Sequence, residues 1–193
     1  QQYSGIRLCG RGDRGVYRRR DQSGGDGGSD PGYQGSRRKR HPYDQAWDIN
    51  TLKEKFALVK DSGAFAAAMD IDAAGLPFLK NQTPPAGSKS VEELKEVVQA
   101  AGVPFILKGI MTVKGALKAK EAGASAIVVS NHGGRVLDQC PPTAEVLPEI
   151  AEAVGKDMKI FVDGGIRSGV DILKALALGA DAVLIGRPFV TAV

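Results

Sequence analysis

The stretch "SNHGGR", residues 130–135, places an ionisable ring and a guanidinium close together in the chain. His132 is one of only two histidines, and an imidazole takes up or releases a proton near neutral pH. Arg135 follows three residues later, and its planar guanidinium can hold a carboxylate or a phosphate through two parallel hydrogen bonds. This combination of residue types suits proton transfer beside a bound anion.

Arginine is rare in most of the chain and lies only beside glycines. Between Asp44 and Val193 there are three arginines against thirteen lysines. They are Arg135 in "HGGR", Arg167 in "GGIR" and Arg187 in "IGRP". Glycine lets a backbone approach a ligand closely, and a turn that opens a helix presents N–H groups to an anion. The two later turns therefore predict a phosphate-binding site.

Short apolar segments alternate with amphipathic ones, and a polar residue follows nearly every apolar segment. This alternation predicts βαβ units and a parallel sheet covered on both sides. Asp48 or Asn50 can cap the first helix, and Ser90 with Glu93 forms a capping box for the second. We expect helices over 51–63, 91–102, 112–123, 143–155 and 169–180, and strands within 64–72, 103–110, 125–134, 158–166 and 181–190.

The chemistry-bearing residues gather where these strands end, which favours one fold class. Asp70, Lys108, His132, Asp163 and Arg187 all lie there. A TIM (β/α)8 barrel collects its active site at the carboxyl ends of its strands. A doubly wound sheet is the alternative, but the chain lacks the glycine fingerprint that usually opens one. We therefore expect a partial TIM barrel with about the last five strands, because a full barrel needs eight strands and roughly 250 residues.

Residues 1–43 differ from the rest of the chain. They carry ten Lys and Arg against four Asp, whereas residues 44–193 carry sixteen against eighteen acids. We interpret 1–43 as a disordered tail or a non-native segment, and 44–193 as the barrel part. A basic arm for nucleic acid is a third interpretation, but only Tyr3, Tyr17 and Tyr33 interleave the charges, so we do not expect a nucleic-acid partner.

The cysteines and the apolar runs predict neither a metal site nor a membrane-spanning segment. Cys9 and Cys140 lie far apart with no metal-ligand spacing, so we expect neither a metal site nor a disulfide framework. No apolar run approaches the roughly 20 residues of a membrane span. A reducing cytoplasm is the expected location.

Three strings together resemble one family. "ILKGI", "VVSNHGGRVLD" and "VDGGIRSGVDILKALALGADAVLIGRPFV" look like the C-terminal half of the FMN-dependent α-hydroxy acid oxidases and dehydrogenases, the family of glycolate oxidase and lactate oxidase. The similarity runs from about residue 48 to the end. It implies FMN as cofactor and the oxidation of a small 2-hydroxy acid, lactate-like or glycolate-like, to the 2-oxo acid.

The resemblance also implies roles for individual residues. His132 takes the substrate proton, and Arg135 holds the substrate carboxylate. Asp70 pairs with the histidine, although Asp72 is a rival for this role. Lys108 lies by the flavin N1–C2 carbonyl, and Ser130 hydrogen-bonds the flavin ring. The resemblance implies that residues around the two glycine turns bind the ribityl chain and the phosphate of FMN. They are Asp163, Gly164, Gly165, Ile166, Arg167, Gly186 and Arg187.

The chain departs from the family pattern in one loop. After "MDID" the family has a loop with a second carboxylate-binding arginine, whereas this chain has "AAGLPFLKN". The substrate therefore stays open, as do the electron acceptor and the oligomeric state, for which a homo-oligomer is compatible with the resemblance. Another phosphate-binding barrel enzyme of FMN or nucleotides, and an inactive barrel fragment, remain as alternative interpretations.

Overall fold

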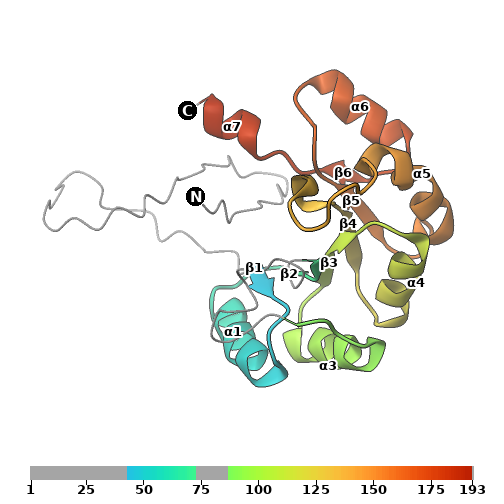
Figure 1. Cartoon of the computed structure of the whole chain (residues 1–193). Coiled ribbons are helices and arrows are strands. Elements are labelled where there is room, and N and C mark those ends of the chain that lie inside the picture. The colour runs from blue at the N-terminus through green and yellow to red at the C-terminus, as the bar shows by residue number, and fades with distance from the viewer. Residues whose placement is uncertain (1–42, 73–86, 193) are drawn as a thin grey trace, which may run out of the picture.

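Six parallel strands form a single sheet in a computed structural model that describes residues 43–72 and 87–192 (Figure 1). Their order in the sheet is their order in the chain. Each strand pairs in parallel with the next one, without any reversal of direction. The strands are β1 (Tyr43–Gln45), β2 (Ala67–Asp70), β3 (Phe105–Ile110), β4 (Ala126–Val129), β5 (Lys159–Val162) and β6 (Ala182–Val183).

The sheet order decides between the two predicted architectures. A doubly wound sheet contains a switch point at which the strand order reverses, whereas a barrel adds its strands in sequence. Sequential order and helices around the outside of a curved sheet, as in Figure 1, are those of a barrel. The prediction of a partial TIM barrel is confirmed. About five strands were expected, and the short strand β1 adds one before them.

Helices follow the strands, and side-chain caps set where several of them begin. The Asp48 carboxylate accepts from the N–H groups of Asn50 and Thr51, so Asp48 rather than Asn50 is the first cap. Ser90 forms the expected capping box, and Ser168 forms another. The helices are α1 (Ile49–Asp61), α3 (Val91–Ala101), α4 (Val113–Glu121), α5 (Thr143–Val154), α6 (Gly169–Ala177) and α7 (Arg187–Thr191), with a 3₁₀ turn, η2 (His132–Gly134), after β4.

The two faces of the sheet have different neighbours. Leu107, Ile127 and Val129 belong to the large core between the strands and the outer helices. The alternate residues Ile106 and Val128 belong to a smaller cluster on the opposite face. Side chains alternate between faces along a strand, so Lys108 and Ser130 continue the inner row, as Asp70 does after Ala68 and Asp163 does after Phe161. The fold thereby directs the polar strand ends inward.

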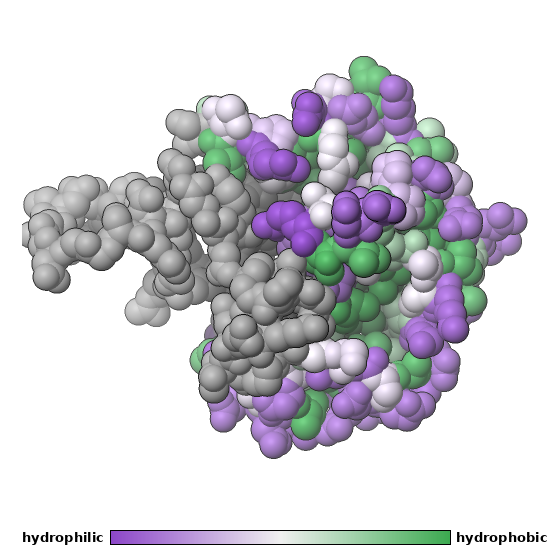
Figure 2. Space-filling model, in the orientation of Figure 1, coloured by the Kyte–Doolittle hydropathy of each residue, from purple (hydrophilic) through white to green (hydrophobic). Residues whose placement is uncertain are grey.

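Hydrophilic residues cover much of the outside. Figure 2 shows hydrophobic residues in the middle of one face of the described part, with hydrophilic residues around them. Among the described helices, none is long and apolar enough to cross a bilayer. Ion pairs join neighbouring outer segments: Lys53–Glu96, Lys95–Glu121 and Lys120–Asp157.

One predicted strand was wrong over most of its length. "DAVLIGRPFV" was expected as a strand, but β6 spans only Ala182–Val183 and Arg187 already begins α7. Pro188 explains the change, because proline lacks an N–H for a strand ladder and suits the first turn of a helix. Arg187 consequently stands at the start of a helix. The interpretations of residues 1–42 and of the "AAGLPFLKN" loop fall outside the described residues.

Candidate active site

Asp70 and Lys108 form a buried ion pair at the carboxyl end of the sheet. The two residues are register partners at the ends of β2 and within β3. Lys108 Nζ lies 2.9 Å from Asp70 Oδ1, and the side chains are only 5% and 3% exposed. Burying either charge without a partner would be costly, so each requires the other here. The pair fixes a cation and an anion on the inner face.

The turn after β4 holds His132 in an unusual backbone conformation. His132 has φ +56°, and Gly133 and Gly134 continue the left-handed region at +68° and +73°. The His132 N–H donates to Ser130 Oγ, and the Gly133 N–H donates to Asn131 Oδ1. A side chain kept at positive φ costs free energy, and such outliers are common where a site is pre-organised. These bonds fix the imidazole at the sheet edge.

Two carboxylates flank the imidazole. His132 Nδ1 lies 3.4 Å from Asp72 Oδ1 and 3.8 Å from Asp70 Oδ2. Burial disfavours the charge on Asp72, but the hydrogen bond with His132 and the charge of Lys108 outweigh it and hold the pKa of this carboxyl below its usual value. The structure therefore brings His132, Asp70 and Lys108 together as expected, and it adds Asp72.

Asp163, after β5, completes this cluster. Its Oδ2 lies 4.0 Å from Lys108 Nζ, and its backbone carbonyl accepts a hydrogen bond from Thr143 Oγ1. Burial raises the pKa of the Asp163 carboxyl, against the opposing charge of Lys108 and a hydrogen bond with Ser130. Asp163 is thus an acidic group whose ionised form the fold disfavours.

The raised pKa of Asp163 predicts a pH dependence of stability. The folded chain binds this proton more tightly than the unfolded chain, so the free energy of unfolding falls as pH rises from the ordinary value of 3.8 through the raised pKa. Asp163→Asn keeps the shape and removes the charge, and we expect it to lack this step. Urea unfolding from acid to neutral pH measures it, with Asp61→Asn on exposed α1 as the control. An unchanged pH profile in Asp163→Asn would contradict the expectation.

The glycine turns leave room for a ligand. Gly164 and Gly165 have φ +88° and +77°. Apart from the adjacent residues in the chain, no described atom lies within 4 Å of the position that a side-chain carbon would take at Gly165 or Gly186. The Arg167 N–H already donates to Asp171, so an anion here would be held by neighbouring groups. Ile166 packs against the large core and anchors the turn.

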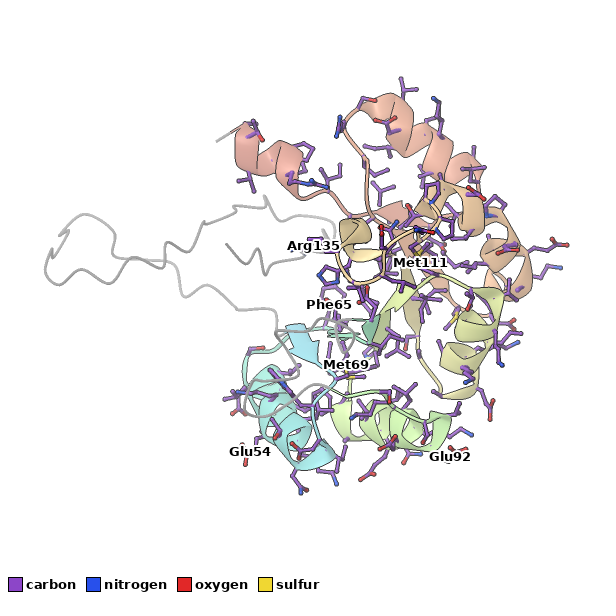
Figure 3. All side chains as sticks on the ribbon, viewed as in Figure 1. Glu54, Phe65, Met69, Glu92, Met111 and Arg135 are labelled. Carbon is purple, nitrogen blue, oxygen red and sulfur yellow. The ribbon has the colours of Figure 1, made fainter. Side chains whose placement is uncertain are left out.

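The two arginines lie close to the histidine turn. Arg187 Nη2 is 3.9 Å from the position of a side-chain carbon at Gly133, so the turn after β6 faces the turn after β4. Arg135 Nε donates to the His132 carbonyl at 3.1 Å, and the residue is exposed. In Figure 3, Arg135 lies inside the arc of helices, whereas Glu54 and Glu92 point outward from α1 and α3. The Arg135 guanidinium is therefore hydrogen-bonded to the backbone of His132, beside which it was predicted to hold the substrate carboxylate.

The trio of Asp70, Asp72 and His132 also has the composition of a metal site. Their ligand atoms lie within 4.8 Å of one another. Lys108, however, supplies a positive charge 2.9 Å from Asp70, where a cation would have to compete with it. The arrangement therefore favours proton transfer over metal binding.

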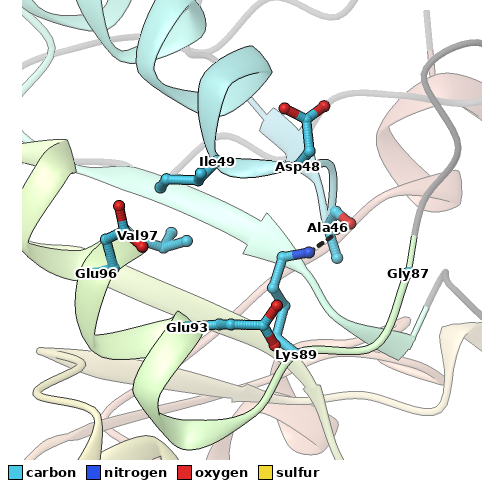
Figure 4. Close-up of a pocket in the computed structure, with 8 residues that line it drawn as sticks. All are labelled: Ala46, Asp48, Ile49, Gly87, Lys89, Glu93, Glu96 and Val97. Carbon is cyan, nitrogen blue, oxygen red and sulfur yellow. Dashed lines mark hydrogen bonds between the residues drawn. The ribbon is translucent and has the colours of Figure 1, made fainter.

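A cavity of about 350 Å³ lies elsewhere, between the starts of α1 and α3 (Figure 4). Asp48, Glu93 and Glu96 contribute acidic groups to its wall. Lys89 Nζ, in the same wall, donates to the Ala46 carbonyl. Asp48 and Glu93 act in helix caps, and Glu96 pairs with Lys53. None of these residues belongs to the His132 cluster.

Comparison with known proteins agrees with this fold and site. Residues 34–193 match the model of a family described as FMN-dependent dehydrogenase. A peroxisomal (S)-2-hydroxyacid oxidase of Arabidopsis thaliana is 50% identical over 102 residues, 53% of this chain and 27% of the relative. An L-lactate dehydrogenase of Actinobacillus pleuropneumoniae is 40% identical over 152 residues, 79% of this chain and 39% of the relative.

Solved structures give the same result. A mandelate oxidase variant with a C4a-OH-FMN adduct superposes with a TM-score of 0.67 at 37% identity, over 77% of this chain and 50% of that one. The chain thus spans between about a quarter and a half of the relatives that it matches. It is a part of an FMN-type TIM barrel. The chain belongs to the FMN-dependent dehydrogenase family, whose members are FMN-dependent α-hydroxy acid oxidoreductases.

Proposed function

We propose that this chain binds FMN and carries the proton-transfer site for oxidising a small 2-hydroxy acid to the 2-oxo acid. The observation that carries the proposal is the convergence of one imidazole, one buried ammonium and two carboxylates beside the glycine turns and Arg187. Membership of the family and relatives named for 2-hydroxyacid and lactate oxidation support it.

The described residues fit the cofactor. Gly165 and Gly186 leave open space on the side where a side chain would otherwise stand, and Arg187, which follows Gly186 in the chain, supplies a cation. Phosphate would be held by this guanidinium, by the backbone of the turn over 164–166 and by the Arg167 side chain. Asp163 would bind the ribityl chain. Ser130 and Lys108, on the inner face of the sheet, would contact the flavin ring. When bound, FMN would supply the acceptor for two electrons and one proton from the substrate, and the second proton would go to His132.

His132 acts as the base. As the carbinol of the substrate becomes a carbonyl, the imidazole accepts one proton and becomes positively charged. Asp70 Oδ2 and Asp72 Oδ1, within 3.8 Å of Nδ1, stabilise that charge. The left-handed backbone at residue 132 keeps the ring in place before the substrate arrives.

Arg135 and Lys108 supply the two cations. Arg135 binds the substrate carboxylate with its terminal amino groups, since Nε is held by the His132 carbonyl. The hydrogen bond from Arg135 to the His132 carbonyl keeps the guanidinium that binds the substrate carboxylate at a fixed distance from the base. Lys108 lies on the inner face, where its ammonium stabilises negative charge that develops on the flavin ring.

The finer features of the function remain predictions. A lactate-like or glycolate-like substrate, a cytoplasmic location and a homo-oligomer are what we expect of the whole protein. The Arabidopsis thaliana relative carries the word peroxisomal in its name.

Binding of the cofactor can be tested apart from catalysis. Titration of FMN with the chain, followed by quenching of flavin fluorescence, gives the Kd. Riboflavin lacks the phosphate and is the matched control. A charge-assisted phosphate contact contributes about 1.5–3 kcal/mol, so we expect FMN to bind roughly 10- to 100-fold more tightly than riboflavin. Equal Kd values would contradict the phosphate site.

A further inference from the structure

Thr143 is a buried polar residue that the proposed mechanism does not use. It is 6% exposed at the start of α5, and its Oγ1 donates a hydrogen bond of 2.9 Å to the Asp163 carbonyl. We propose that Thr143 is a positioning residue for the phosphate turn, residues 164–166, and that its hydroxyl holds this turn in the shape that receives the FMN phosphate. The proposal rests on the proposed function, whereas the hydrogen bond itself needs no ligand.

The Thr143 hydroxyl does not serve its own helix. Hydroxyls at helix starts commonly accept a hydrogen bond from the helix backbone, as Thr112 Oγ1 does from the Gly115 N–H at α4. Helix α5 begins after Pro142 without a side-chain cap. Thr143 instead donates to the residue that follows β5. The contact therefore acts on the turn after β5 and not on the end of α5.

Two hydrogen bonds fix the backbone of Asp163. Its N–H donates to the Val129 carbonyl beside the last residue of β4, and its carbonyl accepts from Thr143. A peptide group is planar and trans, so its carbonyl and its N–H point in opposite directions. Because the Asp163 carbonyl is held toward α5, the Gly164 N–H points away from α5. Thr143 thus sets the direction of the first N–H group of the phosphate turn.

The phosphate turn offers N–H groups that no described residue uses. Gly164 and Gly165 have φ +88° and +77°, and no described residue accepts a hydrogen bond from the N–H of Gly164, Gly165 or Ile166. Successive N–H groups in such a turn can form a concave site for an anion. The next N–H, that of Arg167, donates to Asp171. The available N–H groups are therefore those that directly follow the carbonyl bound by Thr143.

Thr143 can anchor this turn because its own segment is held on two sides. Val146 and Leu147, in the first turns of α5, are buried in the large core. The Pro141 carbonyl accepts a hydrogen bond of 3.1 Å from Asn131 Nδ2, in the turn after β4. The start of α5 consequently contacts both the turn that carries the base and the phosphate turn.

The effect on the turn can be measured without cofactor. Thr143→Val and Thr143→Ala remove the hydroxyl, whereas Thr143→Ser keeps it. In ¹H–¹⁵N spectra we expect the Gly164 and Gly165 amide resonances to shift in the first two variants and to stay near the wild-type positions in Thr143→Ser. Thr51→Val removes a hydroxyl that donates to Asp48 at the start of α1, and it should leave both resonances unchanged. Unchanged glycine amides in Thr143→Val overturn the proposal.

Fluorescence titrations test whether the turn serves the phosphate. We expect Thr143→Val and Thr143→Ala to weaken FMN binding about 2- to 10-fold, the net contribution of one hydrogen bond, and to weaken riboflavin binding less. Thr143→Ser and Thr51→Val should bind both flavins as the wild type does. If the variants without the hydroxyl keep the wild-type ratio of the two Kd values, the proposal is overturned even where the amides shift.

The two measurements separate this proposal from the proposed function. If the wild type binds no FMN while the glycine amides respond as expected, the proposed function fails and the hold of Thr143 on the turn stands. If the wild type prefers FMN to riboflavin and neither this preference nor the amides respond to Thr143→Val, the positioning role alone is overturned.

Discussion

Replacing His132 with alanine is expected to lower the rate of FMN reduction by a 2-hydroxy acid by about 10²–10⁴-fold, the usual contribution of a general base. The reason is that His132 is the imidazole held between two carboxylates at the inner edge of the sheet. FMN binding should persist, because the glycine turns and Arg187 are unchanged. Anaerobic stopped-flow absorbance measures the reduction rate, and fluorescence quenching measures the Kd for FMN.

The control for this variant is the other histidine. His41→Ala makes the same change outside the "SNHGGR" motif and should leave the reduction rate as in the wild type. If His132→Ala lost FMN while the remaining loaded protein was still reduced at the normal rate, His132 would be a cofactor-binding residue and not the base.

Arg187→Ala is expected to have the opposite profile. Loss of a charge-assisted contact of about 1.5–3 kcal/mol should weaken FMN binding roughly 10- to 100-fold. We expect Arg187 to contact the FMN phosphate, because it stands at the start of α7, beside the open Gly186 turn. The Kd of riboflavin should therefore hardly change. Fluorescence titrations with both flavins, in wild type and variant, measure the difference.

Lys174→Ala is the matched control for charge. Lys174 is an exposed cation in the last turn of α6, away from the phosphate turn at the start of that helix. Lys174→Ala lowers the net charge by the same amount as Arg187→Ala and should leave the Kd values of FMN and riboflavin unchanged. Equal weakening of FMN and riboflavin by Arg187→Ala would mean that the guanidinium does not act on the phosphate.

The predictable part of the fold rests on strong local signals. Apolar runs such as 126–129 can be satisfied only by burial, and Ser90 with Glu93 fixes a helix start through its own hydrogen bonds. The meeting of Asp70 and Lys108 at one edge of the sheet was predictable, because the carboxyl ends of parallel strands lie at the same edge.

Other features depend on contacts that a sequence pattern does not carry. The strand β1 is short and polar, "YDQ", and its hydrogen bonds come from pairing with β2. Arg187 was placed in a strand because "DAVLI" is apolar, although Pro188 was the available signal for a helix start. The approach of Asp72 to Gly109 joins the segment after β2 to the register shift in β3, and these are far apart in the sequence.

The most direct test of the account is anaerobic mixing of the FMN-loaded chain with small 2-hydroxy acids, such as lactate, glycolate and mandelate. We predict that at least one of them bleaches the visible absorbance of the oxidised flavin and forms an equal amount of the 2-oxo acid, and that His132→Ala slows both changes by about 10²–10⁴-fold. A chain that binds FMN and stays yellow with every such acid would contradict the proposed function.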